Sequence, residues 1–205
     1  MSKILIVAEH LGGQLNSSTA RCVSCAAAIG GEIHVVVLAD APDAIAAEAA
    51  KIAGVAKVIT VANAANANPI AQVLAPQVAK LAAGYTHVLG PSTTFGKDLM
   101  PCVAALLGVA QVSDIMAVES SHVFKRPIYA GNAIITVEAP ASMAVVGTVR
   151  TASWPAAANG GSGAVEAASV DAALPAHTRF VSLQQGKSDR PDLQGALWTN
   201  PGEIP

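Results

Sequence analysis

The chain has 205 residues, of which 52% are hydrophobic and 13% are charged, and its formal net charge at pH 7 is -2. This length and composition allow a complete hydrophobic core and correspond to one large domain or two small ones. The near balance of charges and the lack of a dense Lys/Arg run exclude the electrostatic surface that a nucleic-acid or anionic-membrane binder needs.

The opening of the chain predicts a strand rather than a signal peptide, because the apolar run at 4–8 is short and Glu9 and His10 follow it at once. No apolar run approaches the roughly 20 residues of a membrane span. The three cysteines give no even disulfide framework, which favours a reducing compartment. We therefore expect a protein of the bacterial cytoplasm without a membrane span.

Short β-branched runs alternate with helical segments over the first half of the chain. The predicted strands lie near 4–8, 33–38, 57–61 and 87–89, and the predicted helices near 18–29, 42–53, 69–83 and 98–107. Apolar runs without polar alternation are typical of strands buried on both faces. With such short links, the alternation predicts a mostly parallel sheet in a Rossmann-like, three-layer α/β domain of the adenine nucleotide alpha hydrolase-like type.

From about residue 113 the pattern changes to Val-, Ile- and Thr-rich runs without helices between them. It predicts a small antiparallel β extension with strands near 115–119, 123–129, 133–138 and 144–148. Residues 154–173 have the Ala-, Gly-, Ser- and Pro-rich composition of a linker, and 178–183 are predicted to form one more strand. We therefore divide the chain into the α/β domain with its extension at 1–151, a linker and last strand at 152–187, and an irregular tail at 188–205.

Two loops follow strands at the predicted carboxyl edge of the sheet, where open α/β sheets usually bind nucleotides. The loop at 90–97 resembles a P-loop, but five residues separate its glycines and Asp98 follows its lysine, so a capping turn before a helix explains it better. The loop at 12–18 lacks the G-x-G-x-x-G fingerprint. Its alternatives are a nucleotide cleft in vestigial form and a loop that meets another protein domain.

No residue pattern specifies catalysis or metal binding. Cys22 and Cys25 have the spacing of a redox dithiol, but they lie well inside a predicted helix rather than at its start, so we expect two small buried side chains facing the sheet. The histidines are dispersed, without a metal-ligand spacing, and no nucleophile elbow is present. They are His10, His34, His87, His122 and His177.

Four segments resemble, in order, the alpha subunit of electron-transfer flavoproteins. They are GKDLMPCVAALLGVA at 96–110, SDI at 113–115, RPIYAGNA at 126–133 and VRTASW at 149–154. The opening ILIVAEH and the late SDRPDL at 188–193 match as well, so the resemblance spans about 3–195. One departure is Cys102, where the family usually has arginine.

The resemblance implies an alpha–beta heterodimer that accepts electrons from acyl-CoA and related dehydrogenases and passes them to a membrane quinone oxidoreductase. This domain would pack against the beta subunit and form the base beneath a mobile flavin domain, as an electron-carrier subunit rather than an enzyme. The family holds FAD in a second domain that begins after the SDRPDL element, and its FAD-binding motifs are absent here. We therefore expect that this chain alone does not bind FAD, and that AMP belongs to the beta partner.

The resemblance also directs attention to Arg126, Tyr129, Asn132 and Arg150, which we expect to face the partner or the flavin domain. The alternative is that they form local hydrogen bonds that hold the extension to the sheet.

Another function remains open, an AMP-binding domain that uses the loops at 12–18 and 90–97. A third possibility is a truncated subunit, because the segment after about Ala196 looks like unrelated or out-of-frame sequence.

Overall fold

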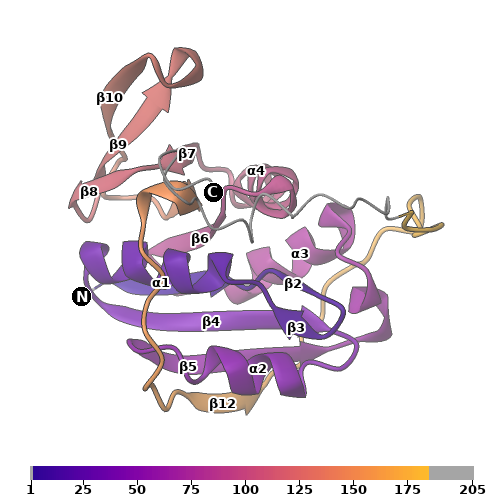
Figure 1. Cartoon of the computed structure of the whole chain (residues 1–205). Coiled ribbons are helices and arrows are strands. Elements are labelled where there is room, and N and C mark those ends of the chain that lie inside the picture. The colour runs from indigo at the N-terminus through magenta and orange to yellow at the C-terminus, as the bar shows by residue number, and fades with distance from the viewer. Residues whose placement is uncertain (1, 185–205) are drawn as a thin grey trace, which may run out of the picture.

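The computed structural model describes residues 2–184 and is built around one seven-stranded sheet. The strand order is β12-β5-β4-β1-β6-β11-β7, and every neighbouring pair is parallel (Figure 1). The strands are β1 Lys3–Val7, β4 Glu32–Ala39, β5 Val55–Ala62, β6 His87–Pro91, β7 Gln111–Ile115, β11 Val145–Val149 and β12 Ala164–Ala167. The prediction of a mostly parallel α/β sheet is confirmed.

Helices cover both faces of this sheet, which makes the three predicted layers. Ile4 and Ile6 of β1 belong to one buried cluster with residues of α1 and α2, whereas Leu5 and Val7 belong to another with residues of α3 and α4. Because successive side chains of a strand point to opposite faces, a continuous apolar run supplies both layers of core. The helices are α1 Ser18–Ile29, α2 Asp43–Ala49, α3 Ala71–Leu81 and α4 Thr94–Leu107, with short 3-10 turns η1 Ala64–Ala67, η2 Tyr129–Gly131 and η3 Thr151–Ser153.

A second, three-stranded antiparallel sheet forms the extension and projects beyond the β7 side of the main sheet (Figure 1). Its strands are β8 Ala117–Ser120, β9 Val123–Ile128 and β10 Ala133–Glu138, in the order β10-β9-β8. The fully buried Phe124 of β9 packs into the cluster beneath α1 and so anchors the extension. A short hairpin of β2 His10–Leu11 and β3 Gln14–Leu15 follows β1.

Four predicted segments need correction, and two of them belong to the predicted extension. The segment at 144–148 was expected in the antiparallel extension, but β11 is a fully buried parallel strand between β6 and β7. Gly147 fits this central place, because a Cβ atom there would lie 2.8 Å from the Ile115 Cδ1 atom. The strand expected near 115–119 is divided between β7 and β8.

The segment at 164–167, expected within a linker, is the edge strand β12, whereas no strand forms at 178–183. Four consecutive exposed residues make up β12, so it carries no apolar pattern that could reveal it. The tail expected at 188–205 lies outside the described residues. Within residues 2–184, no helix has both the length and the apolar character needed to cross a membrane.

Candidate functional site

A small polar cavity lies at the point where the strand order reverses. From β1 the chain continues to β4 and β5 on one side and later crosses to β6 on the other, so the loops after β1 and β6 diverge at the carboxyl edge. Open α/β sheets bind ligands in such a crevice. The cavity measures about 220 Å³ and is lined by Asn16, Ser17, Ser18, Arg21, Thr93, Thr151 and Ala152.

Several polar groups around this cavity are already engaged within the protein. Nη1 of Arg21 donates to the carbonyl oxygens of Thr151, at 3.1 Å, and Trp154, at 2.7 Å. The hydroxyl of Ser18 donates to a carboxylate oxygen of Glu9 at 2.7 Å. The Arg21 guanidinium therefore links α1 to the segment after β11. The Glu9 carboxylate is hydrogen-bonded to Ser18, which lines the cavity.

The loop at 90–97 is a helix cap, as its departure from the P-loop pattern predicted. Oγ1 of Thr93 accepts a hydrogen bond from the Gly96 backbone N–H at 3.4 Å. A Cβ atom at Gly96 would lie 1.8 Å from the carbonyl oxygen of Pro91, so only glycine permits this close approach of the backbone. Helix α4 begins at Thr94, earlier than predicted, and therefore already contains Lys97.

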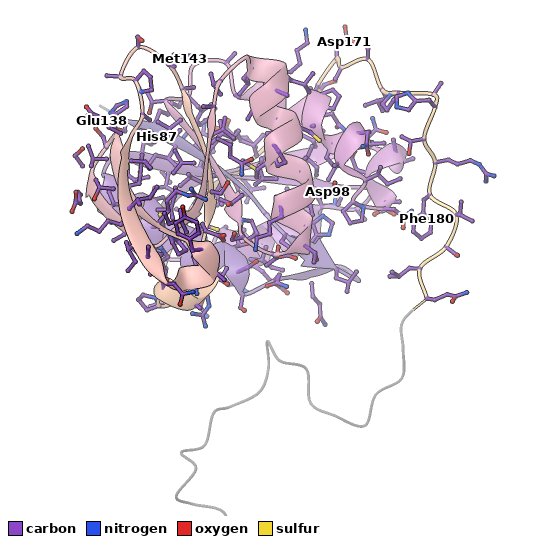
Figure 2. All side chains as sticks on the ribbon, turned by 90° about the horizontal axis from the view of Figure 1, so that it is seen from above. His87, Asp98, Glu138, Met143, Asp171 and Phe180 are labelled. Atoms are coloured by element: carbon purple, nitrogen blue, oxygen red, sulfur yellow. The ribbon has the colours of Figure 1, made fainter. Side chains whose placement is uncertain are left out.

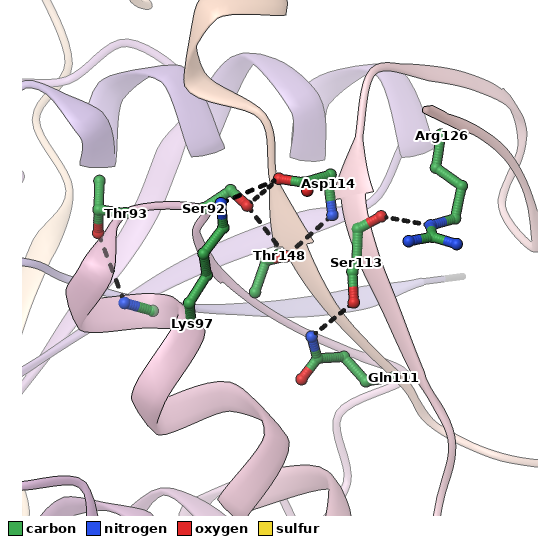
Figure 3. A network of polar contacts seen from close by, with 9 residues as sticks. Ser92, Thr93, Lys97, Gln111, Ser113, Asp114, Arg126 and Thr148 are labelled. Carbon is green, nitrogen blue, oxygen red and sulfur yellow. Dashed lines mark hydrogen bonds and ion pairs between the residues drawn. The ribbon is translucent and has the colours of Figure 1, made fainter. Parts of the chain in front are cut away.

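Asp114 joins the ends of three strands at the same edge (Figure 3). Its carboxylate accepts a hydrogen bond from the Ser92 hydroxyl, and its backbone N–H donates to Oγ1 of Thr148 at 3.0 Å. Nζ of Lys97 lies 3.8 Å from the same carboxylate. Asp114 has φ of 55°, a left-handed conformation that aspartate tolerates better than most residues. Sequence reasoning placed Asp114 in a family segment but missed this role.

The structure separates the four expected interface residues into three places. Tyr129 is 78% exposed, and Asn132 is also exposed, both at the tip of the β9–β10 hairpin. Arg126 lies lower on β9, where its Nε atom donates to the Ser113 carbonyl oxygen at 2.8 Å. Arg150 follows β11 on the main sheet, and its backbone N–H donates to the Ile115 carbonyl oxygen at 3.1 Å.

The cysteines of α1 are packing residues. Cys22 and Cys25 are fully buried against the sheet, as expected. Burial raises the pKa of Cys25 to about 12 and holds the pKa of Cys22 well above its ordinary value. Neither thiol is therefore activated as a nucleophile. Cys102 is half-buried on α4, where its thiol lies 3.4 Å from the Asp98 carbonyl oxygen.

The two strand histidines are held by neighbouring polar groups. His34 contacts the Tyr85 hydroxyl through Nδ1, at 2.5 Å, and a Glu32 carboxylate oxygen through Nε2, at 2.6 Å. Nε2 of the buried His87 lies 2.7 Å from the carbonyl oxygen of Ser121. Among residues 2–184, no group of three or more His, Cys, Asp or Glu side chains is arranged to hold a metal ion.

These features define a Rossmann-like α/β domain with a projecting β extension. The chain matches the electron transfer flavoprotein domain over residues 4–175. It is 49% identical to the electron transfer flavoprotein subunit alpha of Pseudomonas aeruginosa, over 94% of this chain and 62% of that protein. It is 46% identical to the subunit alpha of Bradyrhizobium diazoefficiens, over 94% of this chain and 60% of that protein.

A eukaryotic relative shows the same alignment at lower identity. The mitochondrial electron transfer flavoprotein subunit alpha of Dictyostelium discoideum is 34% identical, over 95% of this chain and 59% of that protein. The chain therefore belongs to the electron transfer flavoprotein family. It spans about 60% of the length of these curated relatives, all of which are named as alpha subunits.

Proposed function

We propose that this chain is the beta-subunit-binding part of an electron-transfer flavoprotein alpha subunit. The complex carries electrons from acyl-CoA and related dehydrogenases to a membrane quinone oxidoreductase, and this part acts as a scaffold without catalytic residues. FAD is held outside residues 1–205, and AMP, where present, by the beta subunit. A bacterial cytoplasmic location is part of the same proposal. The observation that carries it is the projecting, partly apolar hairpin on a chain of this family.

The tip of the hairpin has the surface chemistry of a protein interface. Tyr129 is 78% exposed and Ile134 is 58% exposed, although both are large apolar side chains. Aromatic residues are enriched at interface centres because they bury much area with few rotatable bonds. Tyr129, Ala130 and Gly131 all have positive φ, so the tip has a defined shape rather than an extended form. Asn132 adds an exposed polar group next to this apolar surface.

The proposal is tested by co-expressing the full chain with its beta subunit and comparing Tyr129→Asn with wild type. Asparagine accepts the left-handed conformation at this position and removes the ring, so the hairpin keeps its shape. We expect about a tenfold or greater loss of beta-subunit affinity, which is typical of removing an interface anchor. Lys80→Ala, at an exposed site on α3, is the matched control and should bind as wild type.

Two results would contradict the proposal. Unchanged affinity of Tyr129→Asn would remove the hairpin tip from the interface. A purified complex with the visible absorption of stoichiometric flavin would place FAD within residues 1–205 or the beta subunit. A colourless heterodimer is the expected result.

A second candidate function is adenine-nucleotide binding, favoured by the cavity at the reversal of strand order. Its walls come from the loops at 12–18 and 90–97 and from the segment after β11. AMP would then raise the melting temperature of the isolated chain in a concentration-dependent way. No shift at millimolar AMP would exclude this function.

A further inference from the structure

Three hydrogen-bonded side chains lie in a row at the amino edge of the main sheet. The buried His34 is near the start of β4, and Tyr85 lies in the turn between α3 and β6. Nδ1 of His34 is 2.5 Å from the Tyr85 hydroxyl oxygen, and Nε2 is 2.6 Å from a Glu32 carboxylate oxygen. The order carboxylate, imidazole, hydroxyl is that of a proton relay, with a phenol in place of an alcohol.

The Glu32 carboxylate fixes the tautomer of His34. The hydrogen bond from His34 lowers the pKa of Glu32, which keeps this carboxylate ionised. An ionised carboxylate accepts hydrogen bonds but cannot donate one, so Nε2 of His34 carries a hydrogen. The neutral ring then has a lone pair at Nδ1, to which the Tyr85 hydroxyl donates. Nδ1 is therefore a base positioned to take the phenol proton.

The charges around Tyr85 disfavour the loss of a proton alone or of an electron alone. Burial raises the pKa of the phenol, and the carboxylates of Glu32 and Glu166 raise it further, so a phenolate is disfavoured. Nζ of Lys3 lies 5.0 Å from the ring centroid and would repel a radical cation. Lys57, the other cation of this cluster, pairs with Glu166 at 2.8 Å. A neutral phenoxyl radical carries no charge, so neither penalty applies to it.

An open cavity of about 430 Å³ leads to Tyr85 from solution. Tyr85 is half-buried in its wall, and the loop between β10 and β11 contributes Met143 to the same wall. Met143 and His87, the first residue of β6, lie on one side of the molecule, whereas Phe180 lies on the other (Figure 2). A small molecule can therefore approach the Tyr85 ring from the amino edge of the sheet.

We propose that Tyr85 is a redox-active tyrosine whose proton acceptor is His34. A strong one-electron oxidant from solution, of the class of photoexcited flavins, takes one electron from the Tyr85 ring. The phenol O–H bond breaks and its proton passes to Nδ1 of His34, so the products are a neutral tyrosyl radical, an imidazolium and the reduced oxidant. The Glu32 carboxylate, which accepts the hydrogen bond from Nε2, stabilises the imidazolium. This site does not depend on the proposed interface at Tyr129.

Laser-flash oxidation of the full chain by tris(bipyridine)ruthenium(III), at slightly alkaline pH, tests the proposal. The sequence has two tyrosines, so Tyr129→Phe leaves Tyr85 alone and Tyr85→Phe leaves the exposed Tyr129 alone. Transient absorption follows the neutral tyrosyl radical, whose band is distinct from those of tryptophan radicals. We expect the radical to form at least about tenfold faster in Tyr129→Phe than in Tyr85→Phe, because only Tyr85 has a positioned base.

Further variants in the Tyr129→Phe background separate a proton acceptor from a packing partner. His34→Gln removes the base and should slow radical formation by about 100-fold, an effect typical of a positioned base. Glu32→Gln keeps the base but removes the charge that stabilises the imidazolium, so it should slow the reaction by about tenfold. Glu138→Gln removes an exposed carboxylate of β10 and is the matched control, which should leave the rate unchanged.

Circular dichroism checks that each variant is folded. If His34→Gln does not fold, Glu32→Gln still decides, because the Glu32 side chain is 57% exposed and its replacement leaves the core intact. An unchanged rate in a folded His34→Gln or in Glu32→Gln would overturn the proposal. A radical that forms no faster in Tyr129→Phe than in Tyr85→Phe would overturn it as well.

Discussion

Asp114 connects the extension to the main sheet, and we expect that replacing it with alanine destabilises both. The residue is the last but one of β7, shortly before the chain enters β8, and it contacts the Ser92 hydroxyl after β6 and Thr148 of β11. Asp114→Ala removes the carboxylate but leaves the backbone N–H bonded to Thr148. Ser92 can still donate to the Thr148 hydroxyl, 3.3 Å away. The substitution therefore removes the contacts of the carboxylate and also places alanine at a left-handed φ.

The expected loss of unfolding free energy is the sum of three effects. A hydrogen bond to a charged acceptor contributes about 1.5–3 kcal/mol. The ion pair with Lys97, whose side chain is 58% exposed, contributes about 0–1 kcal/mol after screening by solvent. Alanine at φ of 55° adds up to about 1 kcal/mol of backbone strain that aspartate largely avoids. We expect a loss of about 1.5–5 kcal/mol for Asp114→Ala.

Urea unfolding measures this loss, and Asp114→Asn separates the effects. Asparagine keeps the left-handed conformation and an acceptor oxygen, so it should lose only about 1 kcal/mol. The exposed Asp98→Ala should change stability by less than about 0.5 kcal/mol. Hydrogen exchange should accelerate in β8–β10 of Asp114→Ala. A loss below about 1 kcal/mol for Asp114→Ala, or an equal loss for both Asp114 variants, would refute the reasoning.

Three further predictions concern the core. The buried amides of Asn66 and Gln77 exchange two hydrogen bonds, at 3.1 and 2.7 Å. Each single change to leucine should therefore lower the free energy of unfolding, measured in urea, by about 2–4 kcal/mol. The double mutant should show a coupling energy of about 1–3 kcal/mol in the same assay. Gly96→Ala should cost more than about 3 kcal/mol by the same assay, because its Cβ atom would meet the Pro91 carbonyl oxygen; a loss below about 1 kcal/mol would contradict this. Burial lowers the pKa of His87 below its ordinary 6.5, so the unfolded chain binds the proton more readily than the folded chain. The free energy of unfolding should therefore fall as pH drops below 6.5, and it should fall less steeply with pH in His87→Gln. Equal slopes in the two proteins would contradict this.

The central strands were predictable because their apolar runs serve two core layers at once. β1, β4, β5 and β6 were all expected within a few residues. The parallel pairing of β11 could not be predicted, because a short buried apolar run is compatible with both parallel and antiparallel neighbours. Parallel neighbours need a long crossover, which is usually a helix. Here the whole β8–β10 extension provides that connection, and the chain returns into the gap between β6 and β7.

The edge strand β12 shows the other limit of sequence patterns. Its residues are exposed, so it is held by backbone pairing with β5 and by an ion pair between Lys57 and Glu166 at 2.8 Å. Neither the backbone pairing nor the ion pair produces a pattern of apolar residues in the sequence that would predict a strand. The capping turn at 90–97 was predicted from the spacing of its residues, and the structure confirms it, because Thr93 accepts a hydrogen bond from the Gly96 backbone N–H. The interface role of Arg126, Tyr129, Asn132 and Arg150 stays a prediction.

The nucleotide-sized cavity and the hairpin tip differ in how many of their groups already make contacts within the protein, and this difference favours one proposed function over the other. At the cavity where the strand order reverses, Arg21 donates to two carbonyl groups, and the Ser18 hydroxyl donates to the Glu9 carboxylate. A phosphate there would compete with these carbonyl groups and meet the negative charge at close range. At the hairpin tip, Tyr129 and Ile134 remain largely exposed in the part of the chain that the structure describes. Covering them gains the hydrophobic free energy of their exposed area without breaking an internal contact, which favours a protein partner over a nucleotide.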